Sequence, residues 1–161
     1  MLRADNLVVE FRSGRRVVHA VSGVSFDIHR GETLGLVGES GCGKSTVGRT
    51  LAQVQPATSG RVVYRGRDLG ALSERELRSV RTKLQMIFQD PISSLNPRRR
   101  VKDIVAEPIR NFGLAKSADE LDARVATLLE KVRLPRDAGG RWPHEFSGGQ
   151  RQRIGIARAL A

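Results

Sequence analysis

The sequence predicts an α/β fold in which an N-terminal antiparallel β subdomain precedes part of a parallel α/β core and a helical subdomain. Three observations support this fold class. Short runs rich in Val and Phe alternate with turn residues in the first third of the chain. An apolar run at residues 33–37 leads into a glycine-rich loop and then a helix-type segment. After residue 89 the strand patterns stop and helical spacing begins, which divides the chain into residues 1–89 and 90–161.

The β-type runs at the start are close together, with the turn pairs Ser13-Gly14 and Ser22-Gly23 between them. Such short connections predict antiparallel strands. The expected strands cover residues 7–11, 17–21 and 24–28. Residues 33–37 differ, because they are apolar on both faces and precede a glycine-rich loop. That pattern is typical of a buried parallel strand.

The middle of the chain predicts alternating helices and strands. A helix is expected over residues 46–53, directly after the glycine-rich loop. Strands are expected at residues 61–64 and 84–88. Between them Ser73 and Glu76 have the spacing of a capping box, which predicts the start of another helix.

The last third predicts helices. Ser117 and Glu120 form a second capping pattern, and apolar residues follow at helical spacing. These are Leu121, Val125, Leu128, Leu129 and Val132. A final helix is expected to begin near Ser147. Arg151 and Arg153 would then lie in its first turn, where the helix dipole disfavours cations, so a bound anion would offset that penalty.

Composition and charge narrow the class of protein. No apolar run reaches the roughly 18 residues that cross a bilayer, so we expect a cytosolic chain that can sit on a membrane partner. The single Cys42 excludes an internal disulfide, and His19, His29 and His144 lack metal-ligand spacing. The net charge of +11 suits nucleic acid, anionic lipid or a phosphorylated ligand. Aromatic residues make up only 4%, which argues against a single-strand stacking surface, and the basic run at residues 98–100 is interpreted as a solvated loop.

The stretch "GESGCGKST" at residues 38–46 fits the pattern G-x-x-x-x-G-K-[ST]. Its glycines let backbone N–H groups turn toward an anion, and the helix that follows adds the positive end of its dipole. The pattern therefore predicts a polyphosphate site in which Lys44 reaches the β- and γ-phosphates and Ser45 binds Mg²⁺. Cys42 is expected to be a small loop filler. The expected binding residues are Gly38, Ser40, Gly41, Cys42, Gly43, Lys44, Ser45 and Thr46.

Two further stretches carry a resemblance to a known family. "FSGGQRQRIGIARALA", residues 146–161, resembles the signature motif and following helix of ATP-binding cassette (ABC) ATPases, with Phe146 in place of the usual leucine. Gln89 stands where that family has its Q-loop glutamine. The order and spacing of the motifs match over nearly the whole chain. "QDPISSLNPR", residues 89–98, resembles the oligopeptide and dipeptide importer branch, which includes nickel and glutathione importers, and is more like its F-type than its D-type subunit.

The resemblance implies a P-loop NTPase fold with a RecA-like parallel core, and it implies roles for named residues. Lys44 and Gln89 would be catalytic, and Ser45 and Gln89 would bind Mg²⁺. Phe11 is the candidate for stacking on adenine, with the alternative that it is a core residue. The signature residues of one subunit would contact the ATP that is bound by its partner. These residues are Ser147, Gly148, Gly149 and Gln150.

Family members also have a Walker B strand, a D-loop and a switch histidine, all of which follow the signature helix. The chain ends at Ala161, so we expect the C-terminal core strands to be missing and apolar surface to be exposed. Asp90 follows an apolar run and is an alternative Walker B aspartate. However, Pro91 comes directly after it and no glutamate follows. The 161-residue chain alone is therefore expected to be inactive as an ATPase.

These features predict the ATP-binding subunit of an ABC importer that couples ATP hydrolysis to peptide uptake, with ATP and Mg²⁺ as cofactors. The expected partners are a membrane permease, which would meet residues 89–110, a second ABC ATPase subunit and, indirectly, an extracytoplasmic solute-binding protein. Such a subunit would lie peripherally on the cytoplasmic face of the plasma membrane. No nucleic acid is expected. Two alternatives stay open: a soluble ABC ATPase that acts on nucleic acid or ribosomes, and a catalytically silent nucleotide-binding fragment.

Overall fold

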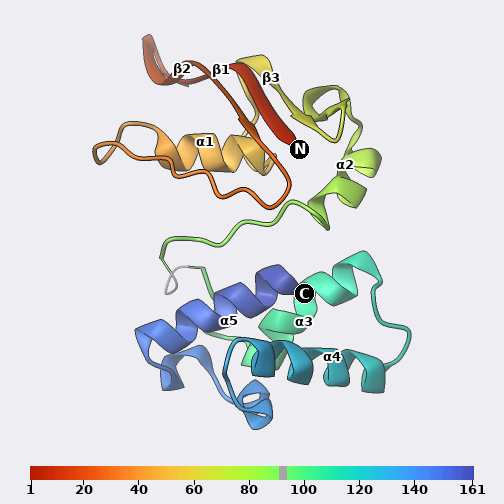
Figure 1. Cartoon of the computed structure of the whole chain (residues 1–161). Coiled ribbons are helices and arrows are strands. Elements are labelled where there is room, and N and C mark those ends of the chain that lie inside the picture. The colour runs from red at the N-terminus through yellow and green to blue at the C-terminus, as the bar shows by residue number, and fades with distance from the viewer. Residues whose placement is uncertain (91–93) are drawn as a thin grey trace. The chain divides into compact units, whose positions relative to one another are not determined.

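In the computed structural model, which describes residues 1–90 and 94–161, the chain divides into two units, Met1–Leu84 and Gln85–Ala161. Each unit has a hydrophobic core of its own. Figure 1 shows a sheet with helices in the first unit, whereas the second unit is helical. None of the helices in the described part of the chain has the length and apolar character needed to cross a bilayer. The sequence places the boundary between the β subdomain with its nucleotide-binding core and the helical subdomain at residue 89, and that assignment stays a prediction.

The first unit is built on an antiparallel sheet of four strands in the order β2-β1-β3-β4. Its strands are β1 (Leu2–Ser13), β2 (Arg16–Ile28), β3 (Ser59–Tyr64) and β4 (Arg67–Asp68). The expected strands at residues 17–21 and 24–28 are one continuous strand, β2. Gly23 between them has a φ of +73° and lies where the register between β1 and β2 shifts, so it marks an irregularity within the strand and not a turn.

Helices cover the sheet of the first unit. Helix α1 (Lys44–Leu51) packs through Val47 on Val9 and Val21 of the β1–β2 hairpin. Helix α2 (Glu74–Arg81) packs Leu77 and Val80 on another apolar cluster of the sheet, next to a short 3₁₀ turn, η1 (Leu69–Ala71). The expected helices at residues 46–53 and after Ser73 are therefore present. The first of them begins two residues earlier than predicted.

Two predicted strands are wrong. Residues 33–37 and 84–88 have no strand structure, and neither segment pairs with any of the strands β1 to β4. Residues 33–37 were also expected to be buried, yet Leu34, Leu36 and Val37 are 42%, 46% and 91% exposed. A parallel strand forms only where neighbouring strands supply hydrogen bonds along both its edges and helices cover its faces. The described residues provide no such neighbours, so these apolar runs stay irregular, and the expectation of exposed apolar surface is met.

The second unit is helical. Helices α3 (Val101–Phe112), α4 (Ala118–Lys131) and α5 (Gly148–Leu160) surround one core, with the 3₁₀ turns η2 (Arg136–Gly140) and η3 (Pro143–Glu145) between α4 and α5. Ile109, Leu129 and Ile154, one from each helix, are fully buried in that core. Only half of the second predicted capping box forms. The Ser117 hydroxyl accepts from the Glu120 N–H at 3.1 Å, but the Glu120 carboxylate accepts from the Lys116 N–H at 2.8 Å.

Candidate functional site

The predicted phosphate loop connects β2 with α1 in the first unit, and glycine geometry shapes it. Gly41 and Gly43 have φ values of +83° and +95°, which L side chains rarely adopt. Gly43 is the N-cap of α1. A Cβ on Gly38 would come within 2.7 Å of the Cys42 Sγ, so the loop closes tightly on itself. Cys42 is a free, exposed cysteine, and its expected role as a small loop filler stays a prediction.

A close backbone approach holds this loop on the sheet. A Cβ on Gly43 would lie 2.1 Å from the Ala20 carbonyl oxygen of β2, a distance that no real side chain tolerates. Val47, one turn further along α1, is buried against Val21 of the same strand. The start of α1 is therefore fixed against β2 in two ways. Gly43 has no side chain, which allows the close approach, and Val47 packs on the strand.

Lys44 folds back over the loop. Its Nζ donates to the Gly38 carbonyl oxygen at 2.8 Å and to the Glu39 carbonyl oxygen, and it lies 3.5 Å from the Cys42 Sγ. The first turn of α1 contains no acidic residue. The N–H groups of Lys44 and the two residues after it have no intrahelical acceptor, because an α-helix leaves its first N–H groups unpaired.

This donor set fits an anion. The Lys44 ammonium group lies at the start of α1, together with the unpaired N–H groups and the positive end of the helix dipole. The first turn of the helix has no acidic side chain that would repel an anion. The Ser45 hydroxyl at the same helix start is exposed and is an oxygen donor of the type that Mg²⁺ prefers. The loop residues therefore fit a phosphate-bearing ligand with its magnesium ion.

Phe11 lies on β1 and its side chain is 41% exposed. The alternative that it is a core residue is therefore wrong. Its strand partner is Val18 of β2, and Ala20, which Gly43 approaches, lies two residues further along the same strand. A strand rises about 3.3 Å per residue, so Val18 and Ala20 are about 7 Å apart along β2. The arrangement leaves an aromatic surface available for a base.

The signature stretch forms the start of α5 in the second unit. The Ser147 hydroxyl accepts from the Gln150 N–H at 3.3 Å, and the Gln150 side-chain oxygen accepts from the Ser147 N–H at 2.9 Å. These two bonds form a capping box, and the helix begins near Ser147 as expected. Phe146, just before it, is 3% exposed and belongs to the core, so an aromatic ring fills this apolar position. The helix start is thus well defined by its own residues.

The arginines near the start of α5 have protein partners. The Arg151 Nε donates to the carbonyl oxygens of Pro143 and Phe146 at 3.0 and 2.9 Å. Arg153 donates to the Arg133 carbonyl oxygen at 2.9 Å. The expectation that a bound anion offsets these charges is therefore not needed, because backbone carbonyl groups already do so.

Gly148 and Gly149, in contrast, are not explained by packing within the chain. A Cβ at either residue would meet nothing within 4 Å, and neither glycine has a positive φ. Glycine in a helix costs roughly 1 kcal/mol relative to alanine. Two consecutive glycines in the first turn of α5 therefore weaken the helix without serving its internal packing.

The structure brings some predicted residues together and leaves others in separate units. The loop residues and Phe11 belong to the first unit, whereas Gln89 and the signature residues belong to the second. Gln89 is exposed at a bend, and Asp90 beside it is exposed as well. Ser45 and Gln89 as a pair of magnesium ligands therefore remain a prediction. In the described residues no group of three or more His, Cys, Asp or Glu side chains has the arrangement of a metal site.

Sequence reasoning missed Arg158, which lies near the end of α5. Its guanidinium donates to the Ser94 carbonyl oxygen at 2.6 Å and lies 5.8 Å from the centre of the Phe88 ring. Burial lowers the pKa of Arg158, with Glu107 acting in the opposite direction. Arg158 therefore ties α5 to both sides of the Gln89 segment. The available signal was one charged residue in the apolar stretch "IGIARALA".

Comparison with known families decides what this loop and helix start belong to. The family model described as ABC transporter matches residues 21–161, which is most of the chain and includes both motifs. The chain belongs to the ABC transporter family.

Curated relatives of this cassette place it more finely. The putative oligopeptide transport ATP-binding protein YkfD and the oligopeptide transport ATP-binding protein OppF, both of Bacillus subtilis (strain 168), are 54% and 53% identical to it. The dipeptide transport ATP-binding protein DppF of Lactococcus lactis subsp. cremoris (strain MG1363) is 54% identical. Each match covers 100% of this chain and 49%, 53% and 53% of the three relatives, so the chain spans about half their length. The predicted resemblance to the oligopeptide and dipeptide branch is confirmed.

Solved structures confirm the fold class of the cassette. The dimeric structure of MJ0796, a bacterial ABC transporter cassette, matches with a TM-score of 0.89 at 30% identity. A second dimeric structure, of a post-hydrolysis state of the ATP-binding cassette MJ0796 bound to ADP and Pi, matches with a TM-score of 0.87 at 28% identity. Both matches cover 100% of this chain and 69% of the other.

Proposed function

We propose that this cassette is the ATP-binding part of an importer subunit that couples ATP binding and hydrolysis to the uptake of peptides through a membrane permease. The proposal rests first on the loop at residues 38–46. There the Lys44 ammonium group and the start of α1 supply a cation and helix N–H donors for an anion, and the close approach of Gly43 to Ala20 fixes the helix start against β2. The peptide class is supported by similarity to proteins whose names describe oligopeptide and dipeptide transport.

Each group of residues would contact a different part of the nucleotide. The N–H groups at the start of α1 would bind the phosphate oxygens, and the Lys44 Nζ would exchange its bonds to the Gly38 and Glu39 carbonyl oxygens for bonds to the outer phosphates. The Ser45 hydroxyl would hold Mg²⁺, which neutralises phosphate charge when it is bound. The exposed Phe11 ring would stack on the adenine.

The glycines of α5 support the proposal that a second cassette completes the site. A Cβ at Gly148 or Gly149 would meet nothing within 4 Å, so the backbone of this helix start is open to the approach of an external surface. The unpaired N–H groups of this helix start suit the outer phosphate of a nucleotide bound by a partner subunit. A permease partner would hold such a pair at the membrane, which makes the subunit peripheral.

Titration calorimetry with ATP and Mg²⁺ tests the first part of the proposal. Lys44→Ala should weaken ATP binding by about tenfold or more, since one charge-assisted hydrogen bond contributes about 1.5 to 3 kcal/mol. Lys116→Ala is the matched control, because it removes the same charge from an exposed position in the second unit. Equal affinities of the wild type and Lys44→Ala for ATP would contradict the proposed role of the loop.

Hydrolysis by the 161-residue chain is a separate question. The second candidate function is a nucleotide-binding fragment that does not hydrolyse ATP. An Asp-Glu pair occurs once in the sequence, at Asp119-Glu120, and it lies in the first turn of α4. The Glu120 carboxylate is already bound to the Lys116 N–H and to Arg124. We therefore expect phosphate release no faster than that of the Lys44→Ala variant. Faster release that depends on Lys44 would show that a catalytic base lies elsewhere in the chain.

A further inference from the structure

The first unit carries a pocket at the C-terminal end of α1, whereas the phosphate loop lies at the start of that helix. The volume of the pocket, about 730 Å³, is within the range of ligand sites. Its walls are the loop at residues 53–58, β3, η1 and α2. All of them belong to the first unit, and none of the residues predicted to hold the nucleotide lines the pocket. The pocket is therefore separate from the proposed nucleotide site.

The most buried residues that line this pocket are apolar. Val62 of β3, Leu69 of η1 and Leu77 of α2 are 3%, 0% and 8% exposed, and they belong to one hydrophobic cluster. Gly60 holds the start of β3 against β1, because a Cβ there would lie 2.1 Å from the Asn6 carbonyl oxygen. The pocket therefore has a packed apolar side on which the apolar part of a ligand can lie.

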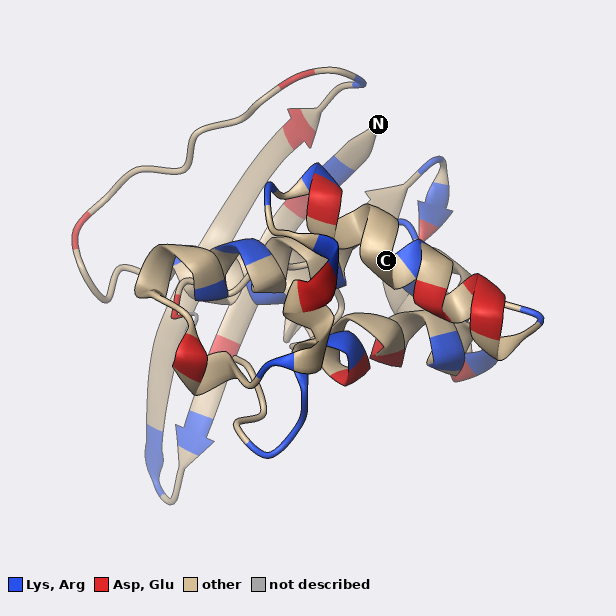
Figure 2. Ribbon diagram, turned by 90° about the horizontal axis from the view of Figure 1, so that it is seen from below, with Lys and Arg blue, Asp and Glu red and all other residues tan. Residues whose placement is uncertain are grey.

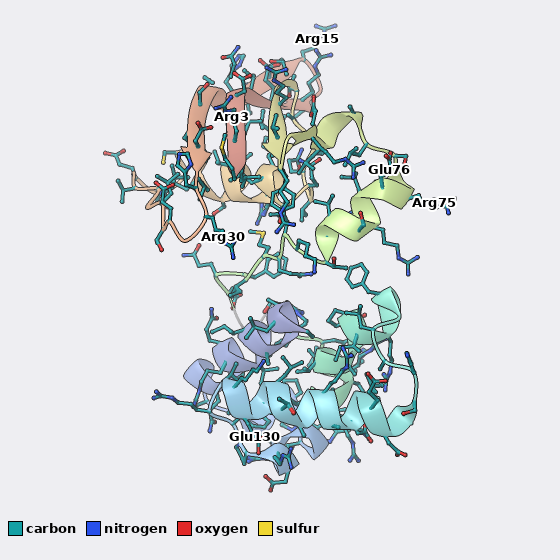
Figure 3. All side chains as sticks on the ribbon, turned by 45° about the vertical axis from the view of Figure 1, so that its right-hand side comes forward. Arg3, Arg15, Arg30, Arg75, Glu76 and Glu130 are labelled. Atoms are coloured by element: carbon teal, nitrogen blue, oxygen red, sulfur yellow. The ribbon has the colours of Figure 1, made fainter. Side chains whose placement is uncertain are left out.

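Charged side chains line the pocket as well, and most of them have ion-pair partners. Arg61 pairs with Asp5 at 2.8 Å, and Arg81 pairs with Glu74 at 2.8 Å. Arg75, which follows Glu74 in α2, points away from the sheet (Figure 3) and does not line the pocket. The two arginines of the pocket are therefore already neutralised by carboxylates.

Asp68 is the charged residue of the pocket that has no ion-pair partner within residues 1–90 and 94–161. Its carboxylate accepts a hydrogen bond from the Gly70 N–H at 2.9 Å, which holds it at the start of η1. An ionised carboxylate accepts several hydrogen bonds, so it can still bind a ligand. Gln53 adds an acceptor, because its amide N–H donates to the Thr50 carbonyl oxygen at 2.9 Å and leaves the amide oxygen for a ligand.

The charges of the pocket favour an organic cation over an anion or a metal ion. An anion would have to displace a carboxylate from Arg61 or Arg81, whereas a cation meets the unpaired carboxylate of Asp68. The net charge of +11 does not prevent this, because acidic and basic segments lie next to each other along the helices in Figure 2. Mg²⁺ and Ca²⁺ need about six or more oxygen ligands. No group of three or more His, Cys, Asp or Glu side chains in the described part of the chain forms such a site.

We propose that the pocket binds an organic ammonium ion with an apolar body. The ammonium group would pair with Asp68, and the apolar body would lie on Val62, Leu69 and Leu77. A simple alkylamine has this chemistry, and so has a short peptide with a free N-terminus and apolar side chains. The identification of the ligand with an imported peptide rests on the proposed function. The charge and shape of the pocket do not.

Heteronuclear NMR of the isotope-labelled whole chain tests the proposal, with leucyl-leucinamide as the probe. The Gly70 N–H donates to the Asp68 carboxylate, so its resonance should shift and reach saturation as the probe binds. The matched ligand N-acetyl-leucyl-leucinamide has the same apolar body without the charge and should bind about fivefold more weakly or worse. Equal affinities for these two ligands, or shifts that cluster away from residues 53–77, would overturn the proposal.

A second ligand pair tests the apolar side of the pocket. Glycyl-glycinamide has the ammonium group but no apolar side chains, so it should also bind more weakly than leucyl-leucinamide. Binding of leucyl-leucinamide should weaken as the salt concentration rises, because salt screens the pairing with Asp68. Equal affinities for glycyl-glycinamide and leucyl-leucinamide would overturn the proposed contact with the apolar side chains. These comparisons use the wild type alone, so they do not depend on the folding of a variant.

Matched variants test the role of Asp68. Asp68→Asn removes the charge, and asparagine caps a helix start as well as aspartate does, so the Gly70 N–H keeps an acceptor. This variant should bind leucyl-leucinamide about fivefold more weakly or worse. Asp122→Asn makes the same change at an exposed residue of α4 in the other unit and should bind as the wild type does. Equal affinities of Asp68→Asn and Asp122→Asn would overturn the proposal.

Two further arms identify the source of the ligand and the level at which a failure occurs. Pentylamine that binds as tightly as leucyl-leucinamide supports a site for amines in general, whereas tighter binding of leucyl-leucinamide supports a site for short peptides. Lys44→Ala should bind leucyl-leucinamide as the wild type does, because the pocket lies apart from the phosphate loop. A wild type that binds leucyl-leucinamide but not ATP would overturn the proposed function and leave the pocket standing.

Discussion

Gly43 is the residue on which the position of the phosphate loop depends. It combines a φ of +95° with an approach to the Ala20 carbonyl oxygen that leaves no room for a Cβ. We expect Gly43→Ala to lower the free energy of unfolding by about 3 kcal/mol or more, because the left-handed backbone alone costs an alanine about 1 to 2 kcal/mol and the steric overlap adds to it. Urea unfolding of the chain without nucleotide measures the loss.

Gly41 provides the control for this substitution. Its φ of +83° is similar, but a Cβ there would meet nothing within 4 Å. Gly41→Ala should therefore cost about 1 to 2 kcal/mol, the backbone contribution alone. Equal losses for the two variants would mean that the approach to Ala20 contributes nothing to stability.

Arg158 is the residue whose importance only the structure reveals. Its guanidinium is partly buried between the Ser94 carbonyl oxygen and the Phe88 ring, and burial lowers its pKa. Arg158→Ala should destabilise the second unit by about 2 kcal/mol, since a hydrogen bond from a charged group contributes about 1.5 to 3 kcal/mol. Hydrogen exchange of the backbone N–H groups of α5, read by mass spectrometry, measures this loss.

The conservative variant sharpens this test. Arg158→Lys keeps the charge but loses the planar group that faces the Phe88 ring, so it should recover only part of the stability. If Arg158→Lys and the wild type exchanged at the same rates, a point charge would suffice and the ring contact would be irrelevant.

At the scale of elements, helix starts were predictable because their signals are local. Ser73 with Glu76 and Ser147 with Gln150 form complete capping boxes, as their spacing indicates. Helix α3 lacked such a signal, since its N-cap Arg100 makes no capping hydrogen bond and Pro108 lies inside the helix. That helix is stabilised by the burial of its apolar face, which depends on α4 and α5.

Strands were less predictable, because a strand exists only with a neighbour. Residues 33–37 have the composition of a buried strand but no partner in the described sheet. The hairpin of β1 and β2 was predicted in outline, since both strands lie together in the sequence. The phosphate loop was also predicted from nine consecutive residues, and its tight turn before α1 fits that prediction. Arg158 was missed because its contacts with Ser94 and Phe88 depend on the packing of distant segments.

The capping box of α2 should give the stability of the first unit a distinct pH dependence. The Glu76 carboxylate accepts from the Ser73 hydroxyl at 2.8 Å and from the Ser73 N–H at 3.0 Å, and Arg67 lies 2.9 Å away. These hydrogen bonds hold the pKa of Glu76 below its ordinary value of 4.5. A depressed pKa means that the stabilisation is present above 4.5 and is lost as the pH falls through the lower, folded value.

Glu76→Gln isolates this effect, because glutamine keeps the capping geometry that Gln150 shows at the start of α5. The wild type should unfold at a higher temperature than Glu76→Gln at pH 7, and the difference should disappear toward pH 3. Thermal unfolding followed by circular dichroism across this pH range provides the measurement. A difference that stays constant from pH 7 to pH 3 would mean that the charge of Glu76 does not contribute.

At the scale of the whole chain, two properties oppose each other. A net charge of +11 repels other copies, whereas exposed apolar side chains attract them. Residues 33–37 form one exposed apolar segment, in which Val37 is 91% exposed. An extended apolar segment without strand partners is a ready template for pairing with another chain. The balance between repulsion and attraction should therefore depend on ionic strength.

We expect the chain to be monomeric at low salt and to self-associate as salt rises, because the Debye length falls from about 30 Å at 0.01 M to about 3 Å at 1 M and removes the repulsion. Val37→Lys should suppress this association by placing a charge in the segment. Val54→Lys adds the same charge at a valine that is 61% exposed outside the segment, and it should associate as the wild type does. Sedimentation velocity at both salt concentrations distinguishes the three proteins. If Val54→Lys suppressed association as strongly as Val37→Lys, added charge alone would explain the result, and residues 33–37 would have no special part in it.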